Sequence, residues 1–349
     1  MEQALYHPEH GYYSSGRASI GLKGDYFTNV SVGPLFGQLL AAQFAEIWKR
    51  LGQIDNFTIV EQGAHDGEFA RDVLTALREK LPEFFSTLRY FIIEPFPVLQ
   101  DRQSHALKEF GDRVQWRRSL DELEPFIGVH FSNELLDAMP VHLVVSTGEG
   151  WREKFVAVDH DQFAFAEQAI VDPALQKRVN FLPAQPAGYE TEINLAALDW
   201  IDRLSSKVTH GYILIVDYGF PREEFYASDR TRGTLQVRAR HRHLVSPLDE
   251  IGHADITAHV NWTSVAERAE TCGLSVNAFI DQHHFLTGII SEFPALIEGE
   301  KAKRALQTLL HPEMLGRAFQ VMALNKDIDL VEPLAGFKYA RDPRVMLDP

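Results

Sequence analysis

The stretch from residue 57 to residue 77 constrains the fold of this chain more than any other. A short apolar run ends in the carboxylate Glu61 and then passes through Gly63 and Gly67. Beyond Gly67, apolar residues recur at helical spacing, namely Phe69, Val73 and Leu77. Such a strand, glycine turn and helix hold nucleotide-type cofactors in α/β proteins, because glycine lets the backbone approach the ligand and the helix offers free N–H groups. A plain structural turn is the alternative, since the spacing is not the dinucleotide fingerprint G-x-G-x-x-G.

Further strand-like segments follow at spacings that leave room for helices between them. The segments are residues 57–61, 90–93, 114–116, 128–132 and 211–216. Strands separated in this way predict right-handed βαβ units and a parallel sheet. Ligands bind such sheets at the carboxyl ends of the strands, so the groups that end the strands are the candidates for a site. These groups are Glu61, Gly63, Gly67, Glu94, Asn133 and Glu134.

The rest of the chain adds other parts to this α/β domain. In residues 1–52, a segment rich in Gly, Tyr and His precedes a helix, and we expect an ordered flap, with an arm that only packs on the core as the alternative. Residues 53–349 are expected to form the main domain. Alternating patterns within residues 141–206 predict an inserted antiparallel β segment followed by a helix. Added helices are expected near residues 297–311 and after Pro312.

The charge balance limits the partners of this protein. Its 349 residues include 34 Lys plus Arg and 49 Asp plus Glu, a net charge of −15, which argues against binding to nucleic acid or to anionic membrane surfaces.

Other features of the sequence concern the location of the protein. Cys272 is the only cysteine, so a reducing compartment is expected. No apolar run reaches the roughly 18 residues of a membrane span. Because the first residues resemble neither a signal nor a transit peptide, we expect a cytoplasmic protein.

Two strand ends carry the residues that indicate chemistry. Glu94 follows the second strand, where a carboxylate can accept hydrogen bonds from two ribose hydroxyls; the alternative is a carboxylate that favours the dipole of the next helix. Asn133 and Glu134 follow the fourth strand, and Asp137 comes three residues later. Two carboxylates there suit a cationic or proton-bearing substrate. The alternative is that Asn133 caps a helix with Glu134 in its first turn.

Other clusters of polar residues have weaker signals. His241 and His243 lie among arginines, but no HExxH or facial-triad spacing occurs, so we expect no metal. The arginines are expected to hold acidic segments of the protein or to guide a substrate. Glu190 and Glu192 are expected at the start of a helix, where they either favour its dipole or form a second anionic clamp. Hydrolase and kinase signatures are absent from the sequence.

Blocks spread over nearly the whole chain resemble the MidA family. The blocks are Tyr6-His7-Pro8, Gly11-Tyr12-Tyr13, Gly24-Asp25-Tyr26-Phe27-Thr28, Glu61-Gln62-Gly63, Ile93-Glu94, Asn133-Glu134-x-x-Asp137-Ala138, Asp217-Tyr218-Gly219 and Asp255-Ile256-Thr257. The family contains class I methyltransferases that depend on S-adenosylmethionine, and its mitochondrial members assist assembly of respiratory complex I by methylating an arginine. The resemblance implies a Rossmann-like, seven-stranded sheet, S-adenosylmethionine as cofactor and a protein substrate, with a respiratory-complex subunit as one candidate.

The resemblance also implies roles for individual residues. Cofactor binding is expected from Glu61, Gly63, Gly67, Glu94 and Asn133. The residues expected to face the transferred methyl group are Glu134, Asp137 and Asn133. We further expect substrate contacts at Asp25, Thr28, Glu190, Asp217, Tyr218 and His259. The turn of the family usually carries a further glycine where this chain has His65, so the conformation of His65 bears directly on the cofactor pocket.

We therefore expect a methyltransferase that acts on a protein nitrogen, with an arginine guanidinium as the favoured target. Glu134 is the expected partner of the guanidinium, and Asp137 and Asn133 orient it. The alternative is an assembly or binding factor with the methyltransferase fold and little or no catalysis. A nicotinamide-dependent oxidoreductase would fit Glu94 but not the glycine spacing. The sequence does not specify the substrate protein or the oligomeric state.

Overall fold

The computed structural model describes residues 1–18, 28–240, 242–329 and 332–347. Asp25, His241 and the part of the predicted flap at residues 19–27 lie outside the described residues.

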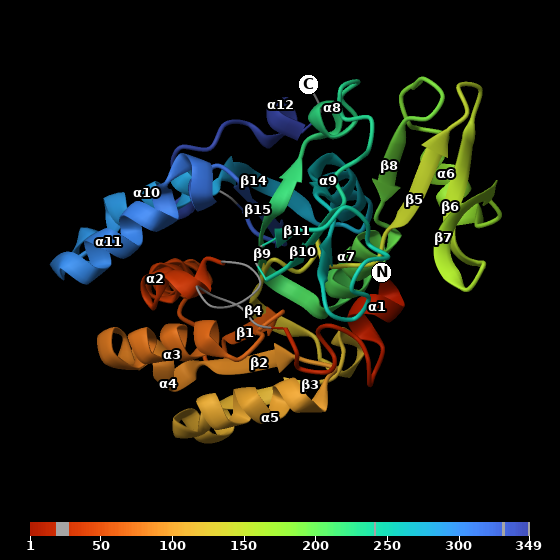
Figure 1. Ribbon diagram of the computed structural model, residues 1–349. Helices are drawn as coiled ribbons and strands as arrows, with labels where there is room; N and C mark the ends of the chain where they lie inside the picture. The colour runs from red at the N-terminus through yellow and green to blue at the C-terminus, as the bar shows by residue number, and fades with distance from the viewer. Residues whose placement is uncertain (19–27, 241, 330–331, 348–349) are drawn as a thin grey trace.

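A mostly parallel sheet forms the centre of the molecule (Figure 1). Seven of its strands follow the order β14-β15-β9-β4-β1-β2-β3, and a short eighth strand, β13, pairs with β9. β15 runs antiparallel to both of its neighbours. The bounds are β1 (Thr58–Gln62), β2 (Arg89–Ile93), β3 (Val114–Arg117), β4 (Phe126–Asn133), β9 (Val208–Phe220), β13 (Val260–Asn261), β14 (Ser275–Asp281) and β15 (Phe319–Lys326). The sheet confirms the predicted α/β class and its seven-stranded path.

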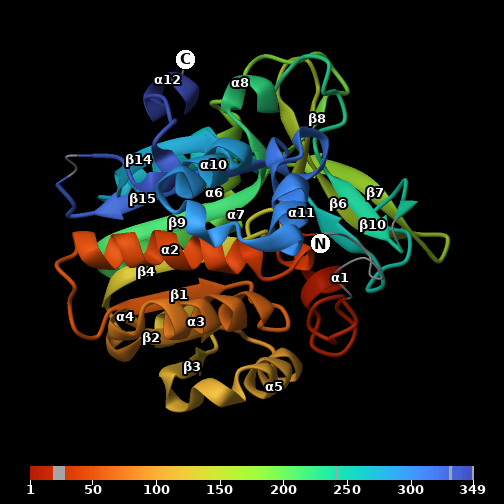
Figure 2. The ribbon, with the colours of Figure 1, turned by 90° about the vertical axis from the view of Figure 1, so that its left-hand side faces the viewer.

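Helices cover both faces of this sheet, because the central strands are apolar on both sides. Ile59 of β1 packs with α2 (Leu35–Arg50) and α3 (Glu68–Lys80), whereas its neighbour Val60 packs with α7 (Leu195–Lys207) and α9 (Trp262–Thr271). Figure 2 shows α2 and α3 side by side in front of the sheet. On the same side as α2 lie α10 (Gln282–Glu292) and α11 (Gly299–Leu310).

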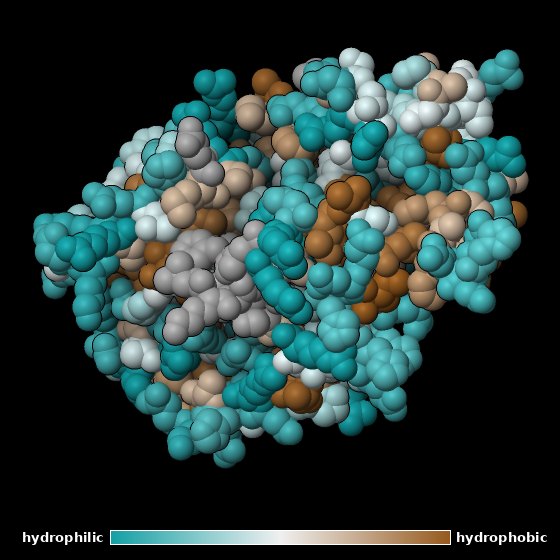
Figure 3. All heavy atoms as spheres, in the orientation of Figure 1, coloured by the Kyte–Doolittle hydropathy of each residue, from teal (hydrophilic) through white to brown (hydrophobic). Residues whose placement is uncertain are grey.

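A second, four-stranded sheet projects to one side of the molecule (Figure 1). Its order is β7-β6-β5-β8, from β5 (His142–Ser146), β6 (Trp151–Asp159), β7 (Gln162–Ala169) and β8 (Glu190–Ile193), all antiparallel. The antiparallel character of the insertion is as expected. Val156, Val158 and Phe163 of this sheet are exposed. Figure 3 shows tan and brown side chains among teal ones on the right-hand side of the molecule, the side on which this sheet lies in Figure 1. α7 follows the sheet but packs on α9 and β9 of the main domain.

The expected helix start at Glu190 and Glu192 is wrong, because both residues belong to strand β8. Glu190 and Glu192 pair with Val145 and Leu143 of β5. The helix begins five residues later than expected, and the side chain of Asn194 caps it by accepting a hydrogen bond from the backbone N–H of Ala197 at 2.8 Å. Thr191 and Ile193 are β-branched and favour a strand, and pairing with β5 decided the local structure.

The arginine- and histidine-rich segment forms a third sheet that the sequence analysis did not predict. β10 (Gln236–Ala239) lies between β11 (Arg242–His243) and β12 (Asp255–Thr257). The apolar side of this sheet packs against α1 (Glu2–Tyr6) and Tyr12. The remaining helices are η1 (Val30–Val32), α4 (Pro82–Thr87), α5 (Pro97–Ala106), η2 (Lys108–Arg113), η3 (Leu120–Glu122), α6 (Pro173–Val179), α8 (Arg222–Phe225), η4 (Pro294–Leu296), η5 (Pro312–Gly316), η6 (Ala335–Phe337) and α12 (Pro343–Leu347). Within the described ranges, no helix has the length and apolar character needed to cross a membrane.

Candidate active site

A cavity of about 750 Å³ opens at the carboxyl ends of β1, β2 and β4. Volumes of roughly 300–1,000 Å³ are usual for sites that hold small molecules and cofactors. Six of the residues selected from the sequence line it: Thr28, Glu61, Gly63, Glu94, Asn133 and Glu134. Parallel strands bring five of these residues, all except Thr28, to one edge of the sheet although they are far apart in the chain.

The backbone of the glycine turn is left-handed at three positions, one of which is His65. Gly63, His65 and Gly67 all have left-handed φ angles, of 84°, 44° and 80°. A residue with a side chain takes this conformation at a cost of about 1–2 kcal/mol. The carbonyl oxygen of His65 accepts a hydrogen bond from the side-chain Nε2 of Gln103 at 2.8 Å, which holds the turn in place. His65 therefore adopts the backbone conformation that a glycine would have, and the cavity remains open beside it.

The two glycines of the turn have different surroundings. Gly63 lines the cavity, and a Cβ atom there would lie 3.6 Å from Leu135 and 3.7 Å from the carbonyl oxygen of Asn133. Gly67 is not part of the cavity wall. It precedes the first residue of α3, and a Cβ atom would lie 3.4 Å from the backbone of Gln103 on α5. Gly67 thus brings the start of α3 close to α5 and does not face the cavity.

Two buried carboxylates stand on the cavity wall. Glu61 accepts a hydrogen bond from the Tyr90 hydroxyl at 2.6 Å, and burial raises its pKa to about 7. Glu94 accepts bonds from the backbone N–H of Phe96 and from the Gln103 side chain, both at 3.0 Å. Burial also raises the pKa of Glu94 to about 7, and these two bonds limit the rise. Both groups therefore titrate near neutral pH, where donors from a ligand would stabilise the ionised form.

Gln103 connects the parts of this wall, and the sequence analysis missed it. Its side chain is fully buried and makes three bonds: Nε2 donates to the His65 carbonyl and to Glu94, and Oε1 accepts from the Trp116 indole at 2.9 Å. The sequence pattern that could have identified Gln103 is the helical spacing of α5, in which Gln103 lies four residues from each of the buried Leu99 and Leu107. A glutamine on the apolar face of a helix needs buried partners.

Asn133 and Glu134 do not begin a helix, so the alternative that Asn133 caps one is excluded. Residues 134–140 contain no helix, and Glu134 has a left-handed φ of 53°. Its N–H donates to the carbonyl of Val216 on β9 at 2.9 Å. The Nδ2 of Asn133 donates to the Oε1 of Glu134 at 2.8 Å. Burial raises the pKa of Glu134 to about 8, and Asp217 and Asp255 add to the rise.

Asp137 and Asp217 lie behind Glu134 and do not line the cavity. Asp217 accepts hydrogen bonds from the backbone N–H groups of Leu135, Leu136 and Asp137, which makes it the residue that holds this turn. Asp137 is only 4% exposed, and its Oδ1 has no hydrogen-bond partner among the described residues. Burial and the neighbouring carboxylates of Asp217 and Glu134 raise the pKa of Asp137 well above its usual value. The result is a buried acidic cluster next to the cavity.

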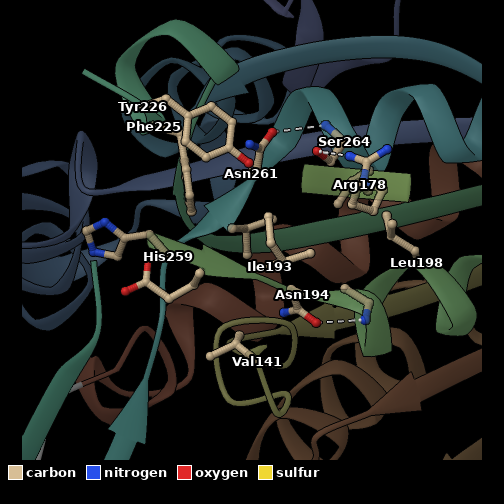
Figure 4. A pocket seen from close by; sticks show the side chains of 14 residues that line it. Val141, Arg178, Ile193, Asn194, Leu198, Phe225, Tyr226, His259, Asn261 and Ser264 are labelled. Carbon is tan, nitrogen blue, oxygen red and sulfur yellow. Dashed lines mark hydrogen bonds between the residues drawn. The ribbon is translucent and has the colours of Figure 1, made fainter. Parts of the chain in front are cut away.

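The other expected substrate contacts are spread over the molecule. Glu190 pairs with Lys154 at 2.6 Å on the four-stranded sheet, away from the cavity wall. Tyr218 packs on Phe319, with ring centroids 4.0 Å apart. His259 and Glu192 line a separate cavity of about 20 Å³ (Figure 4). This volume is close to that needed for one water, so the second cavity is too small for a cofactor.

The described residues contain no cluster of three or more histidine, cysteine or acidic side chains arranged to hold a metal ion. The larger cavity suits S-adenosylmethionine by the hydrogen-bond acceptors on its wall. Glu94 stands at the end of β2, where a carboxylate meets ribose hydroxyls in this class of fold, and Glu61 offers a second acceptor beside the glycine turn. The N-terminus of α3 adjoins this turn. The sheet order and these strand-end carboxylates define a class I methyltransferase.

Comparisons with known proteins lead to the same class. The sequence model of a family of S-adenosyl-L-methionine-dependent methyltransferases matches residues 39–280. The chain belongs to this family. A crystal structure of a COG1565 superfamily member from Burkholderia thailandensis, bound to S-adenosyl-homocysteine, is 31% identical, with a TM-score of 0.87 over 98% of this chain and 90% of that chain.

Curated relatives extend the comparison to mitochondrial proteins. The chain is 25% identical to the Homo sapiens protein arginine methyltransferase NDUFAF7, over 99% of this chain and 82% of the human protein. It is 26% identical to the NDUFAF7 homolog of Drosophila melanogaster, over 93% of this chain and 80% of that protein. This chain is therefore a methyltransferase that depends on S-adenosylmethionine, as the sequence predicted.

Proposed function

We propose that this methyltransferase transfers a methyl group to the guanidinium of an arginine in a protein. The observation that carries the proposal is the position of Glu134, which lines the same cavity as Glu61 and Glu94 and stands in front of a buried acidic cluster. A carboxylate binds a guanidinium through two parallel hydrogen bonds, so one acidic side chain both attracts and orients this substrate.

The bound cofactor supplies an activated methyl group on a sulfonium. Glu134 would hold the guanidinium and orient the nitrogen that receives the methyl group, and the rate would be gained from this positioning. Its raised pKa, about 8, makes Glu134 a stronger base than an ordinary glutamate, so it can accept the proton that the nitrogen releases. Asn133 orients Glu134 by its hydrogen bond, and Asp137 lies beside it in the buried acidic cluster. Cofactor contacts belong to Glu61, Gly63, Glu94 and Asn133.

The names of the curated relatives support a protein arginine as the target, since they are called protein arginine methyltransferases. The resemblance to the MidA family makes a respiratory-complex subunit the first protein to examine. The single cysteine supports a reducing compartment and hence a cytoplasmic location.

The experiment compares arginine methylation in cells with and without the gene, followed by transfer from labelled S-adenosylmethionine to proteins of the deletion lysate. Glu134→Gln should retain binding of S-adenosyl-homocysteine but lose transfer, because it removes the charge and the base. The matched control is Glu149→Gln, an exposed residue that should leave transfer unchanged. Full activity of Glu134→Gln would refute the role of Glu134. Cofactor binding by the wild-type protein without transfer to any lysate protein would favour an assembly factor instead.

A further inference from the structure

Three side-chain amides, joined by hydrogen bonds, form a chain that ends at Glu134. They come from distant parts of the sequence, namely Gln282, Asn29 and Asn133. Gln282 donates through Nε2 to the Oδ1 of Asn29 at 2.7 Å, and Asn29 donates through Nδ2 to the Oδ1 of Asn133 at 2.9 Å. Asn133 in turn donates to Glu134 at 2.8 Å. Asn29 and Gln282 are fully buried. The chain therefore links the first residue of α10 and the residue before η1 to the candidate catalytic carboxylate.

The polarity of this chain is fixed at its far end. The Nε2 of Gln282 also lies 3.4 Å from the backbone carbonyl of Leu309 on α11, an oxygen that can only accept. If the amide of Gln282 turned over, its oxygen would face both this carbonyl and the Oδ1 of Asn29. The Oε1 of Gln282 itself is buried without a partner among the described residues. Gln282 thus directs its donor toward Asn29 and leaves its own acceptor unsatisfied, which is a costly arrangement for a buried amide.

This polarity passes along the chain to Glu134. Because Asn29 must present its oxygen to Gln282, its nitrogen faces Asn133, and the nitrogen of Asn133 then faces Glu134. A donor at this place favours the ionised carboxylate, whereas an acceptor there would favour the protonated form, whose O–H donates. α10 lies on the side of the sheet that α2 covers (Figure 1). The helices on this face therefore fix the position of Gln282, the first amide of the chain.

We infer that Asn29 and Gln282 are positioning residues that hold Glu134 as a hydrogen-bond acceptor through Asn133. Neither residue lines the cavity, so they act without touching the substrate. The inference rests on the proposed role of Glu134. It adds two residues, 253 positions apart in the sequence, to the machinery of methyl transfer.

The test measures the titration of Glu134 in the isolated protein by infrared spectroscopy, with its carboxyl band assigned by the difference from Glu134→Gln. In Asn29→Leu the amide of Asn133 is free to turn, so it can present its oxygen to a protonated Glu134. We expect the pKa of Glu134 to rise by about one unit, the equivalent of one ordinary hydrogen bond. Gln282→Met, at the far end of the chain, should shift the titration in the same direction. The double variant should shift it no further, because both changes release the same amide.

Gln43→Met is the matched control. Gln43 is a second fully buried glutamine on this face, bonded to Glu46 at 2.7 Å and to the backbone N–H of Gly336 at 2.8 Å. This variant should lower the melting temperature and leave the titration of Glu134 unchanged. An unshifted titration in both Asn29→Leu and Gln282→Met, or additive shifts in the double variant, would overturn the inference. Full transfer by Glu134→Gln would instead overturn the proposed function while the titration result still stood.

Discussion

Replacement of Gln103 by leucine should separate the stability of the fold from the strength of cofactor binding. Leucine has nearly the volume of glutamine, so the change leaves little empty space. It removes three hydrogen bonds, which join Gln103 to the His65 carbonyl at 2.8 Å, to Glu94 at 3.0 Å and to Trp116 at 2.9 Å. His65 and Glu94 border the cavity, where water can replace the lost partner, whereas the Trp116 indole is only partly accessible.

The magnitude follows from these partners. A buried polar group left unpaired costs about 1–3 kcal/mol, and water at the cavity reduces the cost for His65 and Glu94. We expect Gln103→Leu to lower the free energy of unfolding by about 3 kcal/mol, which lowers Tm by a few degrees in a chain of this size. The Kd for the cofactor should change by a larger and more easily measured factor. Loss of one charge-assisted bond that orients Glu94 is worth about 1.5–3 kcal/mol, or roughly 10- to 100-fold in Kd.

The assay is calorimetric titration with S-adenosyl-homocysteine beside a thermal melt of each variant. Gln307→Leu provides the matched control, since Gln307 is exposed on α11 and should change neither quantity. An unchanged Kd in Gln103→Leu, together with a lowered Tm, would refute the claim that Gln103 organises the binding wall. An unchanged Tm would refute the claim that Gln103→Leu leaves buried polar groups without partners.

Other predictions concern charge and pH. Glu94→Gln should weaken binding of S-adenosyl-homocysteine by about tenfold or more, because it removes the charge that meets the ribose hydroxyls; calorimetry would show it. Since burial raises the pKa values of Glu61 and Glu94 to about 7, binding should strengthen as pH rises from 6 to 8, and a flat profile would contradict this assignment. Burial lowers the pKa of His130 to about 3. Below about pH 6.5, this histidine therefore binds a proton in the unfolded chain but stays neutral in the folded protein. This group therefore contributes stability that is lost as pH falls from about 6.5 towards 3, at about 1.4 kcal/mol per pH unit. His130→Leu should be less sensitive to acid unfolding than the wild-type protein, and equal sensitivity would refute this.

The sequence alone determined the parallel part of the central sheet and one wall of the site. Apolar runs separated by helical patterns determine a parallel sheet, and a parallel sheet brings its strand ends to one edge. Glu61, Gly63, Glu94, Asn133 and Glu134 could therefore be assigned to one pocket before any coordinates were known. These signals are local or periodic, so they can be read along the chain.

Only the tertiary structure decided which polar side chains face one another. Gln103, Asn29 and Gln282 have no distinguishing local pattern beyond burial, and their partners come from distant parts of the chain. The same holds for Asp217, which resembled a substrate contact in sequence but holds the turn after Asn133. A hydrogen bond depends on the separation and direction of two atoms, and packing fixes both after the elements assemble. The orientation of Glu134 is accordingly a property of the folded protein, set in part by a glutamine at the start of α10.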